Sequence, residues 1–541
     1  MSRMNPNTRL GLGLALTPLL VLSGCSAAGD SAALGEGSAG VSGGGESAGE
    51  GGDEGGAGLG VGQGGAQDFG QFKQILEDGG IPGPETLDDV GFFNEHKITL
   101  PAASCTNDVC LHGLYGEMGN MISGSNCITV LVGMNTAIDV SKLERAPLNL
   151  AVVIDTSGSM QGEPIEYVRE GLYRMLDELV ETDRISLVTF SDSAVVRTEF
   201  VAGTDPALIQ AIDTLNANGS TNLYDGLRTG FELVEAHRDP ALQNRVIFLS
   251  DGVATAGITG DAKILAMGAG FSASGLGLTT IGVGTDFDVT LMRDLSEQGS
   301  GAFYFLQDPA AVQEVFVEEV TSFLVPLAEE VSLSADIVDN YILRAIRGTK
   351  LFEIEGNHGA IEIPNLQLAH RETVDDHDQG RRGGGGAILL ELLPRAGKPR
   401  VQDVGELKLH YRVPGTDTWV DESAPIVTTV APDQIDLEKG VFDNESSEKG
   451  FVMLNIFVGF QMAATRAAQG DLYNALYLLD ALEASVEGWL AEHPDFDIED
   501  DLKYIRLFQD NLVAAGANED PSSPNWVPRP PTPPDPWPNG D

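Results

Sequence analysis

Between residues 148 and 306 the chain alternates short apolar runs with longer amphipathic segments. The apolar runs lie at residues 148–154, 184–190, 194–200, 245–250, 278–284 and 302–306. Runs of this length and composition indicate strands that are buried on both faces of a sheet. After the first run, Ile165, Val168 and Leu172 recur at helical spacing and predict a covering helix. We therefore predict that residues 147–326 form an α/β domain with a doubly wound, mostly parallel sheet.

The second and third runs of this domain are separated only by the residues "SDS", 191–193. A connection this short joins antiparallel strands, because a parallel crossover needs a dozen or more residues. We therefore expect a hairpin here, with one of its two strands at an edge of the sheet.

The segments on either side of the α/β domain have a different pattern. Residues 86–146 and 327–432 contain the runs "CITVLVGM", "VSLSADIV", "AILLELL" and "GELKLHYRV", with turn residues between them and little helical spacing. This pattern is typical of antiparallel β-structure. Because it occurs on both sides, we expect the two segments to form one β-sandwich into which the α/β domain is inserted.

The C-terminal part of the chain changes pattern again. Residues 445–515 show apolar positions at helical spacing in three segments that end near Gln469, Glu492 and Asn511, and they predict a helical region. Residues 516–541 contain too many prolines for a helix or a central strand. They predict an extended, proline-rich tail.

The N-terminus has the features of an export signal. Arg3 and Arg9 precede an apolar run at residues 10–22, which is too short to span a bilayer as a mature helix. The sequence "LSGC" that follows resembles the bacterial lipoprotein signal, which implies that residues 1–24 are removed and that Cys25 is lipidated. By the same resemblance, Ser26 favours the outer membrane. The alternative is a secreted protein without an anchor.

The residues after Cys25 predict a disordered tether over 25–85. Residues 27–67 include 17 glycines, together with Ser, Ala and Glu, and offer almost nothing to bury. Burial in such a segment cannot offset a backbone ordering cost of about 1 to 2 kcal/mol per residue. The tether would hold the folded part of the chain away from the membrane surface.

The charge of the chain limits its partners. The 541 residues include 32 Lys+Arg and 81 Asp+Glu, which give a formal net charge of -49. Long-range repulsion therefore opposes binding to nucleic acid and to anionic membrane surfaces, so contact with the membrane is expected only through the lipid anchor. Cations and basic surfaces remain compatible partners.

Three cysteines remain after Cys25, at Cys105, Cys110 and Cys127. In an exported protein this number predicts one disulfide and one leftover thiol, and the sequence does not show which pair is bonded. A zinc site with His112 as its fourth ligand is possible by count, but the spacing matches no standard zinc finger.

Hard oxygen donors follow three segments of the predicted sheet domain. Asp155 ends the first strand, and Ser157 and Ser159 follow it in the sequence "DTSGSM". Thr221 lies in a glycine-containing loop before a helix, and Asp251 ends the strand "VIFLSDG". Ligands bind at the carboxyl ends of parallel strands, so these oxygens are expected to meet there. Carboxylates and hydroxyls suit Mg²⁺ above all, or Mn²⁺.

In combination, "DTSGSM", the Thr221 loop and "LSDG" resemble the metal-ion-dependent adhesion site of von Willebrand factor A domains. The resemblance covers about 180 residues, in the expected order, and no position of the motif departs from the pattern. It implies that Asp155, Ser157, Ser159 and Thr221 surround the metal and that Asp251 holds it directly or through water. It also implies a von Willebrand A-like fold and a protein partner that presents an Asp or Glu to the metal.

Other interpretations of these residues remain open. The serines could simply cap the following helix, and Asp251 could be an ordinary turn residue of an inert structural protein. A metal-dependent hydrolase or phosphotransferase could use the same crevice. Aspartyl phosphotransferases, however, use two acids spaced by one residue, and here Ser157 stands at the second position. We therefore predict a binding protein of the cell envelope and not an enzyme.

Overall fold

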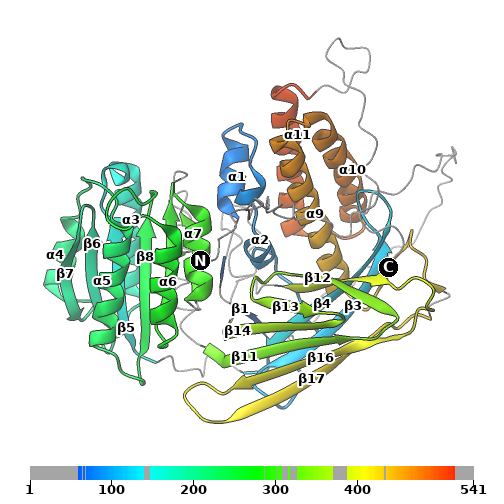
Figure 1. Cartoon of the computed structure of the whole chain (residues 1–541), viewed down its shortest axis with the longest axis horizontal. Helices are drawn as coiled ribbons and strands as arrows, with labels where there is room; N and C mark the ends of the chain where they lie inside the picture. Colours follow the sequence, from blue (N-terminus) through cyan, green and yellow to red (C-terminus); the bar gives the residue numbers. More distant parts are fainter. Residues whose placement is uncertain are drawn as a thin grey trace, which may run out of the picture.

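A computed structural model describes residues 59–63, 65–66, 69–138, 146–284, 287–299, 301–306, 315–316, 326–368, 387–431 and 434–517 (Figure 1). The predicted signal peptide, Cys25, the first part of the predicted tether and almost all of the predicted proline-rich tail lie outside these residues. The described chain contains an α/β domain, a β-sandwich and a layer of helices.

The α/β domain is built on a seven-stranded sheet with the order β2-β10-β9-β8-β5-β6-β7. Its strands are β2 (Gly65–Ala66), β5 (Leu148–Asp155), β6 (Arg184–Phe190), β7 (Ala194–Val201), β8 (Gln243–Ser250), β9 (Gly277–Val283) and β10 (Ala302–Leu306). Neighbouring strands are parallel except β6 and β7, which form the predicted antiparallel hairpin. The doubly wound sheet predicted from the apolar runs is confirmed.

Helices cover both faces of this sheet (Figure 1). They are α3 (Glu163–Asp177), α4 (Pro206–Asp213), α5 (Leu223–Ala236), α6 (Asp261–Ser272) and α7 (Val289–Gln298). Alternate residues of β5 enter two separate cores: Val152 and Ile154 pack with α3 and α4, whereas Ala151 and Val153 pack with α5, α6 and α7. Both faces of the central strand are buried, which explains why its sequence is apolar without alternation.

The β-sandwich combines strands from both sides of the α/β domain. It consists of β1 (Leu59–Gln63), β3 (Cys110–Gly119), β4 (Asn126–Thr136), β11 (Pro326–Ile337), β12 (Tyr341–Arg347), β13 (Phe352–Glu355), β14 (His358–Leu368), β15 (Ile388–Pro394), β16 (Asp403–Arg412), β17 (Trp419–Val427) and β18 (Val441–Phe442). β4 pairs with β15, so strands that precede and follow the α/β domain share one sheet. The α/β domain is thus inserted into the β-structure, as its sequence pattern predicts.

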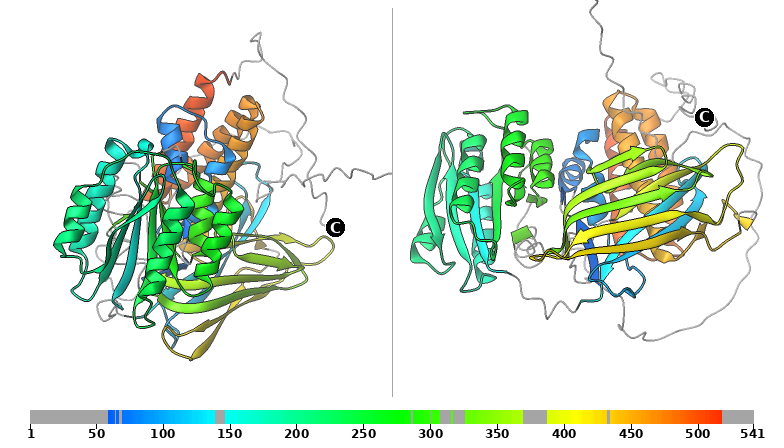
Figure 2. Two further views of the ribbon diagram at one scale, coloured as in Figure 1. Left: turned by 60° about the vertical axis from the view of Figure 1, so that its left-hand side comes forward. Right: turned by 60° about the horizontal axis from the view of Figure 1, so that its bottom comes forward.

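A helical layer packs on the outer face of the sheet that contains β3 and β4 (Figure 2). It contains α1 (Gly70–Glu77), the 3₁₀ helix η1 (Pro84–Thr86), α2 (Asp89–Asn94), α9 (Glu445–Ala468), α10 (Leu472–Leu490) and α11 (Phe496–Ala514). α9 is long and apolar enough to cross a membrane by composition, but 72% of its most apolar window is buried inside the fold. It is the central helix of this layer, and the three predicted C-terminal helices are present.

The structure corrects two predictions about the N-terminal half. The tether was expected to run to residue 85, but the described residues from 59 onward include β1, β2, α1 and the start of η1. Residues 86–146 were expected to be β-structure, but α2 lies among them. Phe69, Phe72 and Leu76 bury one face of α1 in the core of the helical layer, and Phe92 and Phe93 of α2 enter the same core. These buried apolar side chains stabilise the segment, whereas the glycine-rich residues around it have little apolar surface to bury.

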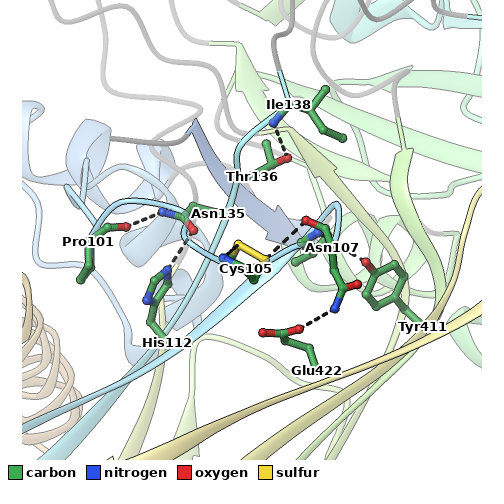
Figure 3. Close-up of a disulfide and its surroundings, with 11 residues drawn as sticks. Pro101, Cys105, Asn107, His112, Asn135, Thr136, Ile138, Tyr411 and Glu422 are labelled. Atoms are coloured by element: carbon green, nitrogen blue, oxygen red, sulfur yellow. Dashed lines mark hydrogen bonds between the residues drawn. A yellow bond between two sulfur atoms is a disulfide. The ribbon is translucent and has the colours of Figure 1, made fainter. Parts of the chain in front are cut away.

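The cysteine prediction is correct for one pair and wrong for the third residue. Cys105 and Cys110 form a disulfide at the start of β3 (Figure 3). Cys127 is also disulfide-bonded, and no free cysteine is present in the described chain, so the expected leftover thiol is absent. His112 Nε2 forms a hydrogen bond with Asn135 Oδ1 at 2.9 Å (Figure 3). In the described chain the sulfur atoms of all three cysteines are used in disulfides, so none of them is free to bind zinc beside His112.

Ion pairs to buried carboxylates join the α/β domain to the rest of the chain. Arg293 of α7 contacts Asp88 at 3.0 Å, and Lys350 contacts the same carboxylate at 3.0 Å and Asp89 at 2.7 Å. Burial opposes ionisation of Asp88, but Lys350 and Arg293 outweigh it and hold the pKa of Asp88 below its ordinary value. Burial, and then the charge of Asp88, raise the pKa of Glu297 on α7 to about 8.

Candidate metal centre

The predicted metal ligands lie where the order of the α/β sheet reverses. From β5 the chain continues to β6 on one side, whereas β8, β9 and β10 follow on the other side. β5 and β8 are parallel neighbours, with Ile154 paired with Leu249, so Asp155 and Ser250 end adjacent strands at the same edge. In doubly wound sheets this edge is where ligands bind.

Asp155 is fixed by hydrogen bonds at the end of β5. Its Oδ1 accepts a hydrogen bond from the Ser157 backbone N–H at 2.8 Å, and its Oδ2 accepts one from Ser250 Oγ at 2.6 Å. The side chain is 0% exposed. Burial raises the pKa of Asp155 above its ordinary value, although the hydrogen bonds from Ser250 and Ser157 act in the opposite direction. A buried carboxylate of this kind gains from a nearby positive charge.

Ser157, Ser159 and Asp251 continue from Asp155 as a connected row of oxygen atoms. Ser157 Oγ lies 3.0 Å from Ser159 Oγ, and Ser159 Oγ donates a hydrogen bond to Asp251 Oδ1 at 2.8 Å. The short 3₁₀ helix η3 (Gly158–Met160) holds the two serines in this position. Ser157 and Asp251 are buried, whereas Ser159 is exposed. The row therefore starts inside the domain and opens to solvent at Ser159.

Thr221 reaches the same opening from a different loop. The loop before it is bonded to the Ser157 turn: Gly158 N–H donates to Gly219 O at 3.1 Å, and Asn218 N–H donates to Thr156 O at 2.7 Å. A Cβ atom at Gly252 would lie 3.5 Å from Thr221 Oγ1 and 3.7 Å from Ser159 Oγ. Both hydroxyls thus lie close to the backbone of Gly252, next to Asp251.

The geometry of these oxygens fits a small divalent cation. Octahedral Mg²⁺ has bonds of about 2.0 to 2.1 Å to oxygen, which place neighbouring ligand atoms about 2.9 Å apart. The Ser157–Ser159 and Ser159–Asp251 oxygen pairs, at 3.0 Å and 2.8 Å, are already at this spacing. The donors are carboxylate and hydroxyl oxygens, the types that Mg²⁺ and Mn²⁺ prefer. Ser157, Ser159 and Asp251 therefore have an oxygen spacing that suits one such ion, and Asp155 and Thr221 lie next to them.

Several supporting residues were not singled out from the sequence. Ser250 holds Asp155, and Gly252 lies close to the hydroxyls of Thr221 and Ser159; both residues adjoin Asp251 in the motif "LSDG". Thr156 N–H donates to Phe190 O at 2.8 Å and ties the site to the end of β6. This last contact follows from the position of β6 beside β5 in the sheet.

Two further acids near the site stabilise loops. Asp192 accepts hydrogen bonds from the backbone and hydroxyl of Ser220, and these bonds lower its pKa. Asp225 accepts a hydrogen bond from Ala194 N–H at 2.8 Å, which lowers its pKa, and also pairs with Arg228. Both acids are engaged with neighbouring loops and lie outside the row of metal-binding candidates.

Comparison with known proteins identifies the domain. Residues 149–318 match the von Willebrand factor type A domain. The uncharacterized protein YfbK of Escherichia coli (strain K12) is 30% identical over 253 residues, which are 46% of this chain and 42% of YfbK. The uncharacterized protein sll0103 of Synechocystis sp. is 24% identical over 343 residues, which are 62% of this chain and 77% of that protein.

One solved structure aligns with much of this chain. A von Willebrand factor type A protein from Catenulispora acidiphila has a TM-score of 0.48 at 16% identity, covering 75% of this chain and 91% of that one. This chain spans less than half the length of YfbK, at 42%. The matched residues 149–318 coincide with the α/β domain that carries Asp155, Thr221 and Asp251.

Proposed function

We propose that this chain, whose residues 149–318 form a von Willebrand factor type A domain, binds a protein ligand through a divalent cation at the carboxyl edge of that domain. Domains of this class are associated with protein–protein interaction and adhesion, and many bind a divalent metal. The observation that carries the proposal is the row of oxygens from Ser157 through Ser159 to Asp251, at 3.0 Å and 2.8 Å. Mg²⁺, or Mn²⁺, is the proposed ion.

Each residue of the site has a defined part in this proposal. Ser157, Ser159 and Thr221 would offer hydroxyl oxygens to the cation. Asp155 and Asp251 would supply the only carboxylates of the proposed ligand set. Hydroxyl ligands add no charge, so the cation keeps enough positive character to accept one more carboxylate, from an Asp or Glu of the ligand. Ser159 is exposed, so the Asp or Glu of the ligand can reach the cation from solvent.

We also propose that the protein is displayed at the surface of a membrane. The support is the N-terminal sequence: an apolar signal at residues 10–22, followed by "LSGC" and a glycine-rich stretch. Lipidation would place a lipid on the Cys25 sulfur and anchor the chain, most simply in the outer membrane. It excludes a disulfide at Cys25, so lipidation and a disulfide between Cys127 and that residue are alternatives. The segment between Cys25 and β1 would then carry the binding domain away from the bilayer.

The test is ligand capture with a matched pair of variants. The purified chain is incubated with envelope extract in Mg²⁺ or in excess EDTA, beside Asp155→Ala and Asp177→Ala. Asp177 is an exposed Asp of the same domain, at the far end of α3 and about 20 Å from the site by helix length. We expect Mg²⁺-dependent capture by the unmodified chain and by Asp177→Ala, and none by Asp155→Ala.

Two results would contradict the proposal. Capture that is unaffected by EDTA and by Asp155→Ala would indicate a structural protein whose site is inert. Hydrolysis of phosphate esters by the purified chain, lost in Asp155→Ala and kept in Asp177→Ala, would indicate an enzyme that uses the same crevice.

A further inference from the structure

The loop that follows Asp251 exposes two aliphatic side chains. Val253 is 52% exposed and Ile258 is 37% exposed. Single exposed apolar residues are common on protein surfaces and need no explanation. Here two of them belong to one short loop, which begins at a candidate metal ligand.

This loop is attached to the metal site by backbone hydrogen bonds. Thr255 N–H and Ala256 N–H donate to Thr221 O at 3.0 Å and 3.2 Å, and Thr221 N–H donates to Thr255 Oγ1 at 2.9 Å. Val253 and Ile258 flank the two residues that are bonded in this way. The loop that carries both aliphatic residues is therefore held beside Thr221 at its middle.

The surface around the metal site, here called the rim, includes the Val253–Ile258 loop and, in a second part, the acidic residue Asp192. Asp192, in the turn between β6 and β7, is exposed, and its carboxylate accepts a hydrogen bond from Ser220 N–H at 2.9 Å. Asn222 Nδ2 donates to the Asp192 backbone carbonyl at 3.0 Å, so this turn is held next to the Thr221 loop. Among the described residues no Lys or Arg forms a salt bridge with Asp192, so its negative charge is not neutralised, although the carboxylate is hydrogen-bonded to Ser220.

We infer that the ligand presents an Asp or Glu flanked by a bulky apolar side chain and by a Lys or Arg. This inference rests on the cation-dependent binding proposed above. The acid would reach the cation, the apolar side chain would pack on Val253 and Ile258, and the basic side chain would face Asp192. The net charge of -49 is a second reason to expect a basic side chain beside the acid, because it repels partners whose acid lies in an acidic surface.

A random peptide library displayed on phage tests this inference. The library is bound to the whole purified chain in Mg²⁺ and eluted with EDTA, so that only metal-dependent binders are recovered. We expect the recovered sequences to share an Asp or Glu with an aliphatic or aromatic neighbour and a Lys or Arg nearby. Two synthetic peptides from this set then serve as probes for variants.

The variants separate the rim from the metal site. Val253→Ser with Ile258→Ser should weaken peptide binding about tenfold, because two aliphatic contacts are lost. Asp192→Asn should weaken binding and reduce its dependence on salt. Val180→Ser is the matched control: Val180 is 51% exposed, but it lies in the loop between α3 and β6, at the opposite edge of the sheet. Mg²⁺ affinity should be unchanged in all three.

The possible outcomes distinguish failure of this inference from failure of the proposed metal-dependent function. Recovered peptides that share an acid but show no preference for apolar or basic neighbours would overturn the inference and leave the metal-dependent function intact. Equal binding by the Val253/Ile258 variant and the Val180 control would overturn it as well. Recovery of no acidic peptide, with no Mg²⁺ binding by the unmodified chain, would overturn the inference and the proposed function together.

Discussion

Asp155 depends on a neighbour that sequence motifs do not emphasise. Ser250 Oγ donates to Asp155 Oδ2 at 2.6 Å, and both residues are fully buried. The pairing follows from the adjacency of β5 and β8, which places the last residues of two parallel strands side by side. The metal-binding candidates could be predicted from "DTSGSM" and "LSDG", whereas the role of Ser250 requires the strand order.

Removal of the Ser250 hydroxyl should cost stability. Ser250→Ala leaves one oxygen of the buried Asp155 carboxylate without its donor, so we expect the free energy of unfolding to fall by about 1 to 3 kcal/mol. Ser272→Ala is the matched control, since Ser272 Oγ is buried without a hydrogen-bond partner in the described chain. Its removal should leave stability unchanged or slightly raised. Denaturant unfolding of both variants without metal measures the difference, and equal stabilities would contradict this account of Ser250.

At the level of elements, long apolar strands were predictable and short ones were not. The runs at 148–154 and 302–306 appear as β5 and β10 because their burial on both faces requires a continuous apolar sequence. β2 has only two residues, Gly65 and Ala66, and exists because it pairs with the edge of β10. Such a strand has no pattern of its own. α2 was missed for a similar reason: its six residues, 89–94, are too few to show a helical period.

The contact between α7 and α2 should make stability depend on pH. Glu297 has an ordinary pKa of 4.5 that rises to about 8 in the fold, so the folded state binds this proton more tightly than the unfolded state. The stability that it contributes is fully present below about pH 4.5 and is lost as the pH rises to about 8. Asp88, whose pKa is lowered, behaves in the opposite way and contributes at all pH values above its ordinary pKa of 3.8.

Glu297→Gln should remove this loss of stability at high pH. The neutral side chain does not add charge beside Asp88, Asp89 and Asp294, so we expect the variant to exceed the unmodified chain in stability by about 1 to 2 kcal/mol at pH 8.5. At pH 5 the two should differ less. Thermal or denaturant unfolding of the whole chain at both pH values measures this, with Glu181→Gln, at an exposed position, as the control. A constant difference across the pH range would contradict the assignment.

At the scale of the whole molecule, residues 59–66 connect two sheets. β1 pairs with β4 and β14 of the β-sandwich, and β2 pairs with β10 of the von Willebrand factor type A domain. The insertion of one domain into the other was predictable, because β-type sequence occurs on both sides of the α/β segment. The connecting strands were not, since their glycine-rich sequence is typical of a tether. Their pairing depends on backbone groups of distant segments, which composition does not report.

The central claim is that oxygens from separate loops meet around one divalent ion. The most direct measurement is an anomalous difference map from crystals of the whole chain grown with Mn²⁺. The account predicts a strong peak bounded by Ser157 Oγ, Ser159 Oγ and Thr221 Oγ1, with Asp155 and Asp251 beside it, and no such peak in Asp155→Ala crystals. Fully ordered side chains with no peak at this position, or with the ion bound elsewhere, would contradict it.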